Sequence, residues 1–289
     1  MTAIRSTVPM PSVSDADDAR TVLEEALSLY RMDPGLALHR AAEAALFRRL
    51  VLRGPILDLG CHDGDFSWLA LRPVAAQAGI IGSDRDLEGL ARCRARGVHW
   101  GVVGLDATRL PFGAGAFGSV ICNSVLAHID DLSGALREIA RVLAPGGVLA
   151  ATVPTPAFHG LFAPVRLLHA FGLRSTAQRV ATGYDRVWNQ RHFLSESEWR
   201  ALLEGADLSL ESWTEYLGPR GSLQWSSLFL LTRVGVGRAT LGALLRRLFP
   251  AGAARSRWLE RRLANWLAPA VRLDSPGGSA LMLARRVGT

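Results

Sequence analysis

The sequence of 289 residues contains no lysine, so all 33 of its basic residues are arginine. Cysteine is also scarce: Cys61, Cys93 and Cys122 form an odd set with no Cys-x-x-Cys pair and no cysteine–histidine cluster along the chain. This set excludes a disulfide framework and indicates no metal site. Thiols of this kind are typical of a reducing compartment, so we expect a cytoplasmic protein. Charged residues make up only 20 % of the chain and hydrophobic residues 49 %, which excludes intrinsic disorder.

Long uninterrupted apolar helices are missing as well. Residues 110–129 and 142–165 contain no charged side chain and are long enough to span a membrane. Both windows are broken repeatedly by proline and glycine, which favours buried strands and turns. Residues 1–20 carry prolines and acids where a secretory signal has an apolar run, so we expect no export signal.

Basic charge is confined to one end of the chain. Residues 220–289 contain 12 arginines and two acids, whereas residues 1–219 contain 21 arginines and 24 acids. Because the longer part is mildly acidic and carries no recognisable RNA-binding module, we do not expect nucleic acid as a partner.

Apolar runs alternate with amphipathic segments, a pattern that predicts an α/β fold with a mostly parallel sheet. A capping box at Ser195 and Glu198 marks one helix start, and residues 154–194 are irregular. Helices are predicted at 17–32, 36–52, 65–76, 86–96, 133–143 and 195–204, and strands at 55–59, 79–83, 98–103, 117–123, 147–153, 208–217 and 279–286.

A glycine turn and two acids follow three successive strands. Gly60 and Gly64 allow close backbone approach to a ligand at a helix start. Asp84, at the end of the next strand, is placed to accept bonds from both hydroxyls of a ribose, and Asp106 to accept one from an adenine amine. Carboxyl ends of parallel strands meet at one edge of a sheet, so these residues favour an adenosyl ligand.

In these motifs the sequence resembles the class I S-adenosylmethionine-dependent methyltransferases that act on small molecules. The resemblance covers about residues 54–154 and implies a Rossmann-like, seven-stranded sheet of order 3-2-1-4-5-7-6 with its last strand antiparallel. A dinucleotide dehydrogenase fits less well, because its motif requires glycine where this chain has His62 and Asp65. The motifs are Asp58-Leu59-Gly60, Ser83-Asp84, Asp106-Ala107, Leu110-Pro111-Phe112, Phe117 to Asp131, and Arg141 to Gly147.

The resemblance also assigns cofactor contacts, which we state as expectations. Asp58 and Gly60 adjoin the methionine amino group of S-adenosylmethionine, Asp84 binds the ribose, and Arg85 flanks the adenine. His62 stands where the family has glycine, a departure that leaves open a cofactor-binding protein without methyl transfer. The expected cofactor residues are Asp58, Gly60, His62, Gly64, Asp84, Arg85, Asp106, Ala107 and Asn123.

Methyl transfer to a hydroxyl or carbon atom also requires that a proton be removed. The candidate bases are His128, just after the fourth strand, and His159 and Tyr184 in the irregular segment. His192 and the cysteines Cys61 and Cys122 are interpreted as structural.

Four segments are expected: N-terminal helices at 1–53, a cofactor-binding core at 54–219 with a substrate cap at 154–194, a basic, Trp-rich helical insertion at 220–275, and the final strand at 276–289. Leucines and tryptophans such as Trp258 and Trp266 form apolar stripes beside arginines in the insertion. Packing on the domain or in a homodimer, peripheral membrane contact, and an acceptor cap are the alternatives for it.

The sequence therefore predicts a methyltransferase that uses S-adenosylmethionine and acts on a small acceptor, apolar or acidic, with O-methylation favoured. The first alternative is a membrane-surface methyltransferase of a quinone, isoprenoid or lipid-linked glycan. The second is a protein of the same fold that binds the cofactor without transferring methyl.

Overall fold

The computed structural model describes residues 15–30, 33–236, 239–250, 252–271 and 275–288. Its main sheet has seven strands in the order β3-β2-β1-β4-β5-β9-β6, and a separate two-stranded ribbon joins β7 and β8. Strands β1 to β5 run parallel, whereas β9 is antiparallel to both neighbours. Since β9 is the seventh strand of this sheet along the chain, the predicted order and the predicted antiparallel last strand are confirmed.

The central strands are short apolar runs that are buried on both faces, as parallel sheets require. In β1, Ile56–Leu59, all four residues are buried. The other strands of the main sheet are β2 (Ile80–Asp84), β3 (Gly101–Gly104), β4 (Phe117–Asn123), β5 (Leu143–Pro154), β6 (Leu208–Tyr216) and β9 (Ser279–Arg286).

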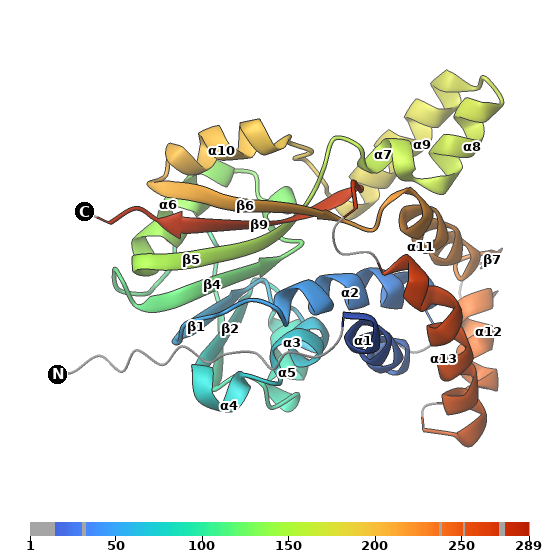
Figure 1. The fold of residues 1–289 in the computed structure, drawn as a ribbon, viewed down its shortest axis with the longest axis horizontal. Coiled ribbons are helices and arrows are strands. Elements are labelled where there is room, and N and C mark those ends of the chain that lie inside the picture. The colour runs from blue at the N-terminus through green and yellow to red at the C-terminus, as the bar shows by residue number, and fades with distance from the viewer. Residues whose placement is uncertain (1–14, 31–32, 237–238, 251, 272–274, 289) are drawn as a thin grey trace.

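Helices cover the sheet on both faces (Figure 1). On one face lie α1 (Asp15–Leu29), α2 (Pro34–Phe47), α3 (Asp65–Leu71) and α5 (Leu87–Ala95), and on the other lie α6 (Leu132–Val142) and α10 (Glu196–Glu204). The side chains of successive strand residues alternate between two hydrophobic cores: Ile56 belongs to the core that includes α1 and α2, and Leu57 to the core that includes α6 and α10.

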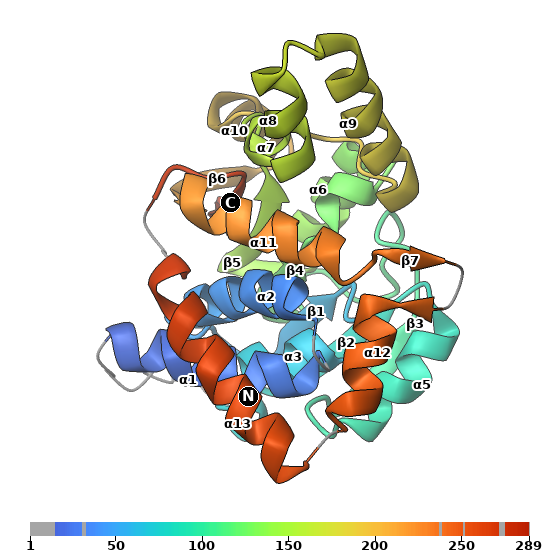
Figure 2. The same cartoon turned by 90° about the vertical axis from the view of Figure 1, so that its right-hand side faces the viewer.

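Most of the remaining helices gather at one end of the sheet (Figure 2). After β5 come α7 (Phe158–Leu161), α8 (Ala163–Ala170) and α9 (Arg174–Trp188). Between β6 and β9 come α11 (Pro219–Leu231), β7 (Gly235–Val236), β8 (Ala239–Thr240), α12 (Leu241–Leu248) and α13 (Ala254–Leu267). Helix α11 lies between α2 and the α7–α9 group, and α13 lies along α1.

Element boundaries differ from the expectations in a few places. The helix expected at 65–76 ends at Leu71, before Pro73, and a short α4, Ala75–Ala78, follows. The second predicted helix ends at Phe47, the third strand begins at Gly101, and residues 31–32 of the first predicted helix lie outside the described residues. The capping box of Ser195 and Glu198 is present.

Within the described ranges, no helix combines the length and the hydropathy needed to cross a bilayer. The division of the chain into four segments stays a prediction.

Candidate functional site

Two cavities meet at the carboxyl ends of the parallel strands. The first has a volume of about 550 Å³ and lies beside the ends of β1, β2 and β4; we call it the polar cavity. The second, of about 250 Å³, is lined mainly by aromatic rings and is called the aromatic cavity. Arg40, Ser124 and His128 line both. These three residues therefore form the junction at which a ligand in one cavity meets a ligand in the other.

Most of the expected cofactor residues lie together on the polar cavity. Loops after four strands contribute them, so residues from Gly60 to Asn123 converge on one space. Asp58 and Gly64 do not line it. Those that do are Gly60, His62, Asp84, Arg85, Asp106, Ala107 and Asn123.

The loop between β1 and α3 has a left-handed backbone at three positions. Gly60, His62 and Gly64 have φ angles of 82°, 46° and 76°. A Cβ on Gly60 would lie 2.2 Å from a methyl carbon of Val125, so glycine is required there for space as well as for conformation. His62 adopts the same conformation with a side chain, which is strained for a residue other than glycine.

The His62 ring projects from the loop and is largely exposed. Its nitrogens lie 3.5 Å from Asp63 and 3.4 Å from Asp86, and 58 % of the side chain is accessible. Its backbone N–H donates to Asp84 Oδ2 at 2.9 Å. With His62 in place of glycine, the loop therefore still orients Asp84 through its backbone.

Backbone donors hold both acids of the polar cavity. The second carboxylate oxygen of Asp84 accepts from the Asp86 N–H at 2.9 Å. Asp106 accepts from the backbone N–H and the hydroxyl of Thr108 at 2.9 and 2.8 Å, and these bonds lower the pKa of Asp106. Each oxygen of Asp84 keeps a second lone pair, whereas Asp106 takes both Thr108 bonds on Oδ1 and leaves Oδ2 for a ligand. Both acids are therefore oriented and still able to accept from a ligand.

Asp58 does not line the polar cavity and is held by neighbouring side chains. It is buried and accepts hydrogen bonds from Ser67 Oγ at 2.5 Å and from the His99 ring nitrogen Nε2 at 2.8 Å. It borders a third cavity of about 280 Å³, which also includes Arg40 and Gly60. A contact between Asp58 and the methionine amino group stays a prediction.

A buried carboxylate that the sequence did not reveal lies beneath the junction. Glu43 of α2 is fully buried and accepts hydrogen bonds from Arg40 at 2.7 Å, Ser124 at 2.9 Å and Tyr216 at 3.0 Å. Ser124 has a φ of 56°, and its backbone N–H donates to the Thr152 hydroxyl at 2.9 Å. Glu43 thus joins α2, the end of β4 and the end of β6 around the site.

The opposite charges of Glu43 and Arg40 keep both side chains ionised. Burial alone would raise the pKa of Glu43, but Arg40 and, to a smaller extent, His39 lower it well below its usual range. Burial likewise opposes the charge of Arg40, and Glu43 raises the pKa of Arg40 above its usual value. The pair is therefore ionised at any physiological pH.

The three candidate bases differ in position. His128 lies at the junction, where its Nδ1 is 3.1 Å from the Asn189 carbonyl oxygen. Tyr184 lines the aromatic cavity, and burial raises its pKa above its usual value. His159 lines neither cavity; its Nε2 is 2.8 Å from Asp185 Oδ1. His192 contacts the Ile129 carbonyl oxygen at 2.8 Å, an environment that suits a structural residue.

Helices from three parts of the chain enclose the aromatic cavity. Phe158, Tyr184 and Trp188 come from α7 and α9, and Trp225 and Phe229 come from α11. These rings pack at tilted angles against one another, with centroids 5.5 to 6.2 Å apart. Such a lining suits an apolar or aromatic ligand.

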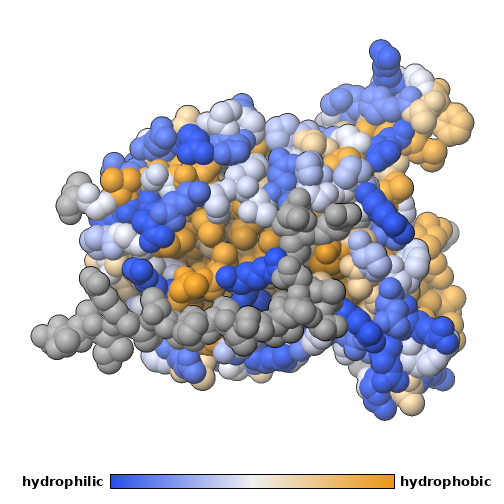
Figure 3. Space-filling view, in the orientation of Figure 1, coloured by the Kyte–Doolittle hydropathy of each residue, from blue (hydrophilic) through white to orange (hydrophobic). Residues whose placement is uncertain are grey.

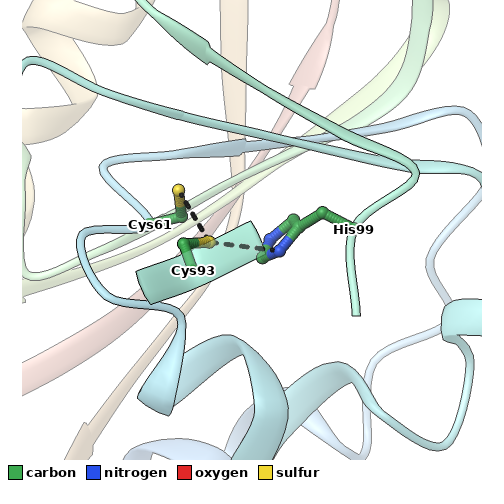
Figure 4. A group of neighbouring side chains, drawn as sticks. All are labelled: Cys61, Cys93 and His99. Atoms are coloured by element: carbon green, nitrogen blue, oxygen red, sulfur yellow. Dashed lines mark hydrogen bonds between the residues drawn. The ribbon is translucent and has the colours of Figure 1, made fainter. Parts of the chain in front are cut away.

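A third set of residues is brought together only by the fold. Cys61, Cys93 and His99, which are separated in sequence, have their sulfur and ring nitrogen atoms within 4.8 Å of one another (Figure 4). The sequence shows no such cluster along the chain, but the fold forms one. Linear spacing gave no signal, because the cluster is assembled from the β1–α3 loop, α5 and the segment before β3.

Comparisons with known proteins agree with this geometry. A family model described as a methyltransferase domain matches residues 57–151. A ubiquinone/menaquinone biosynthesis C-methyltransferase of Desulfotalea psychrophila is 32 % identical over 133 residues, 44 % of this chain and 53 % of the relative. A malonyl-[acyl-carrier protein] O-methyltransferase of Legionella pneumophila is 37 % identical over 105 residues, 35 % of this chain and 36 % of the relative.

The fold has relatives among solved structures. A geranyl diphosphate methyltransferase in complex with geranyl diphosphate and sinefungin superposes with a TM-score of 0.55 over 87 % of this chain and 81 % of that chain, at 16 % identity. The family model and the sheet order identify residues 57–151 as part of a class I methyltransferase domain, whose methyl donor is S-adenosylmethionine. The chain spans about half or less of the length of the curated relatives named here.

Asp84 provides a direct test of the polar cavity. Asp84→Asn should weaken S-adenosylhomocysteine binding by about 1 to 3 kcal/mol, because charge-assisted bonds to two ribose hydroxyls are lost. Titration calorimetry measures the change, and Glu88→Gln on the exposed face of α5 is the matched control. Equal affinity of the two variants would show that Asp84 does not bind the ribose.

The lowered pKa of Glu43 predicts that the stability of the protein depends on pH. Its pKa is lower in the folded chain than in the unfolded chain, where it is about 4.3. Its stabilising effect is therefore present above that value and is lost as the pH falls through and below it. Glu43→Gln should lower the free energy of unfolding at pH 7 by about 1 to 3 kcal/mol and flatten its decline between pH 5 and pH 3.

Denaturant unfolding across this pH range measures both effects. Glu196→Gln, which removes an exposed carboxylate paired with Arg200, is the control and should change stability little. If the free energy of unfolding of Glu43→Gln declines as steeply toward low pH as that of wild type, protonation of Glu43 is not what destabilises the folded chain.

Proposed function

We propose that this protein is a methyltransferase that transfers the methyl group of S-adenosylmethionine to a small, apolar, hydroxyl-bearing acceptor, with O-methylation favoured. The observation that supports this most directly is the junction: Arg40, Ser124 and His128 border both the polar cavity and the aromatic cavity. A cofactor in one and an acceptor in the other would meet there.

The residues of the polar cavity fit the cofactor's polar groups. Asp84 and Asp106 present oriented carboxylates to the ribose and the adenine amine. Arg40 borders all three cavities and carries the positive charge that a methionine carboxylate requires. When bound, the cofactor supplies an electrophilic methyl group on sulfur, so the protein itself must orient the acceptor and remove its proton.

His128 is the base best placed to accept that proton. A carbonyl oxygen can only accept a hydrogen bond, so the contact with Asn189 places the ring proton on Nδ1 and leaves the Nε2 lone pair free. Tyr184, whose pKa is raised by burial, instead contributes aromatic surface and a hydroxyl that can orient the acceptor. His159 lines neither cavity, so we expect it to stabilise the cap at 154–194 and not to accept the proton.

One curated relative supports an aromatic hydroxylated acceptor, because it is named as a ubiquinone/menaquinone biosynthesis C-methyltransferase. The malonyl-[acyl-carrier protein] O-methyltransferase supports transfer to oxygen but not an aromatic acceptor. Loss of a hydroxyl proton activates a phenol-type oxygen and also the adjoining ring carbon, so the same base serves either outcome. We therefore expect a phenol, a hydroquinone or a related enol in the aromatic cavity.

His128→Asn should retain the hydrogen bond to Asn189 but remove the base. We expect turnover with a panel of apolar phenols and hydroquinones to fall about 10² to 10⁴-fold, with S-adenosylhomocysteine affinity unchanged. Carbon-13 methyl labelling and NMR identify the methylated atom. Tyr184→Phe is the control and should change KM more than kcat; full turnover by His128→Asn would exclude His128 as the base.

A membrane-surface location is supported by exposed hydrophobic residues near the aromatic cavity. Hydrophobic surface lies along the right-hand edge of the molecule in Figure 3, over the α8–α9 hairpin and the α11–α12 region. Phe171 and Val234 are 72 % and 63 % exposed there. Arg246 and Arg247 in the last turn of α12 add positive charge. Apolar groups beside arginines are typical of interfacial helices, and a bilayer would supply an apolar acceptor directly to the cavity.

Liposome flotation tests this location. The double variant Phe171→Ser/Val234→Ser should bind more weakly than wild type to vesicles that contain anionic lipid, because both apolar contact area and insertion are reduced. Val287→Ser, which is 52 % exposed next to β9 at the other end of the sheet, is the control and should bind like wild type. Trp258 and Trp266 of α13 line neither cavity, so their replacement should not change acceptor affinity.

A further inference from the structure

Four side chains form a hydrogen-bonded chain beneath the loop between β1 and α3. The Asp58 carboxylate contacts His99 Nε2 at 2.8 Å, His99 Nδ1 lies 3.3 Å from Cys93 Sγ, and Cys93 Sγ lies 3.5 Å from Cys61 Sγ. Cys93 lies between Cys61 and the imidazole ring (Figure 4). This order resembles an acid–histidine–thiol relay, extended by a second thiol.

The pKa values of the two cysteines are shifted in opposite directions, upward for Cys61 and downward for Cys93. The hydrogen bond with Cys61 and, to a smaller extent, the His99 ring lower the pKa of Cys93 to about 6 against the opposing effect of burial. Burial opposes the charge of His99, but Asp58 and Cys93 raise its pKa to about 9. These directions favour a Cys93 thiolate beside a His99 imidazolium, with the proton between the two sulfurs on Cys61.

Glycine at position 82 leaves room for Cys61 and for the ring of His99. A Cβ on Gly82 of β2 would lie 3.0 Å from Cys61 Sγ and 2.8 Å from the His99 ring, so glycine leaves the space that these side chains occupy. Cys61 borders the third cavity together with Arg40 and Gly60, whereas Cys93 is fully buried. A small reagent in that cavity reaches Cys61 first.

We propose that Cys61 and Cys93 are an oxidative modification site, at which hydrogen peroxide forms a disulfide that closes the cofactor site. Cys61 belongs to the loop between Gly60 and His62, and Cys93 belongs to α5. A disulfide draws the two sulfurs from 3.5 Å to about 2.05 Å. The shift pulls the loop toward α5, and Gly60, already packed against Val125, moves out of position.

The chemistry balances with peroxide as the oxidant. Cys61 loses its proton to the Cys93 thiolate as its sulfur attacks one peroxide oxygen; the O–O bond breaks, and the released hydroxide takes a proton from solvent to form water. Cys93 sulfur then attacks the Cys61 sulfenic acid, the S–O bond breaks, and the Cys93 proton leaves with the hydroxide as a second water. The two sulfurs together lose two electrons, which reduce the peroxide.

The effect on binding rests on the proposed cofactor, although disulfide formation itself does not. The third cavity shares Arg40, Gly60 and His62 with the polar cavity, so a bound cofactor restricts access to Cys61. We therefore expect S-adenosylhomocysteine to slow the oxidation, and the oxidised protein to bind S-adenosylhomocysteine at least tenfold more weakly.

The experiment treats the full chain with hydrogen peroxide, with and without S-adenosylhomocysteine. Mass spectrometry identifies the cross-link, and calorimetry measures affinity before oxidation, after it, and after reduction with dithiothreitol. We expect a Cys61–Cys93 link, a loss of affinity that reduction reverses, and no such loss in Cys93→Ser. Cys122→Ser, which removes a buried thiol outside the cluster, is the control and should respond like wild type.

Several outcomes would overturn the proposal. They are the absence of the link in wild type, a link that leaves affinity unchanged, and equal sensitivity of Cys93→Ser. One zinc ion per chain in the purified protein would identify a metal site instead. If Cys93→Ser does not fold, Cys93→Ala is used in its place. If reduced wild type forms the link but never binds S-adenosylhomocysteine, the proposed function fails while the modification site remains.

Discussion

The ion pair of Glu43 and Arg40 is the constraint on which the site depends. A buried carboxylate is stable only when it is paired and hydrogen-bonded, and Glu43 meets this requirement with groups from α2, β4 and β6. These groups cannot be repositioned one at a time, because each is a partner that Glu43 needs. The same contacts fix Arg40 and Ser124 at the junction of the two cavities, so a structural requirement determines the functional geometry.

The two cavities differ in how their walls are made. Turns after short parallel strands supply the polar cavity, and backbone N–H groups orient its acids. Helices inserted after β5 and β6 supply the aromatic cavity, whose lining is a set of packed rings. The wall of the polar cavity is continuous with the strands of the sheet, so the positions of its residues have little freedom to vary. The wall of the aromatic cavity consists of side chains on helices outside the sheet, where substitutions change the shape of the acceptor cavity without altering strand pairing.

The sequence predicts local features of this protein well and distant contacts poorly. The β9 strand at 279–286, the capping box at Ser195 and the convergence of Asp84 with Asp106 follow from patterns that lie within a few residues or at the ends of successive strands. The contacts of Glu43 with Ser124 and Tyr216 and the approach of Cys93 to Cys61 do not, because each joins elements that are far apart in the chain. Arg40 offered a weak signal: it is a cation on a helix that is otherwise largely buried and apolar.

The position of β9 has a consequence for how the chain folds. This strand lies between β5 and β6 and pairs with both, yet it follows every other element in the sequence. Until β9 is in place, β6 has no neighbour in the sheet, and β5 presents an open hydrogen-bonding edge while α7 to α13 are already synthesised. Closing the sheet therefore requires pairing between residues far apart in the chain, which is slow. During synthesis this edge is where an incomplete chain is most exposed to wrong pairing with another chain.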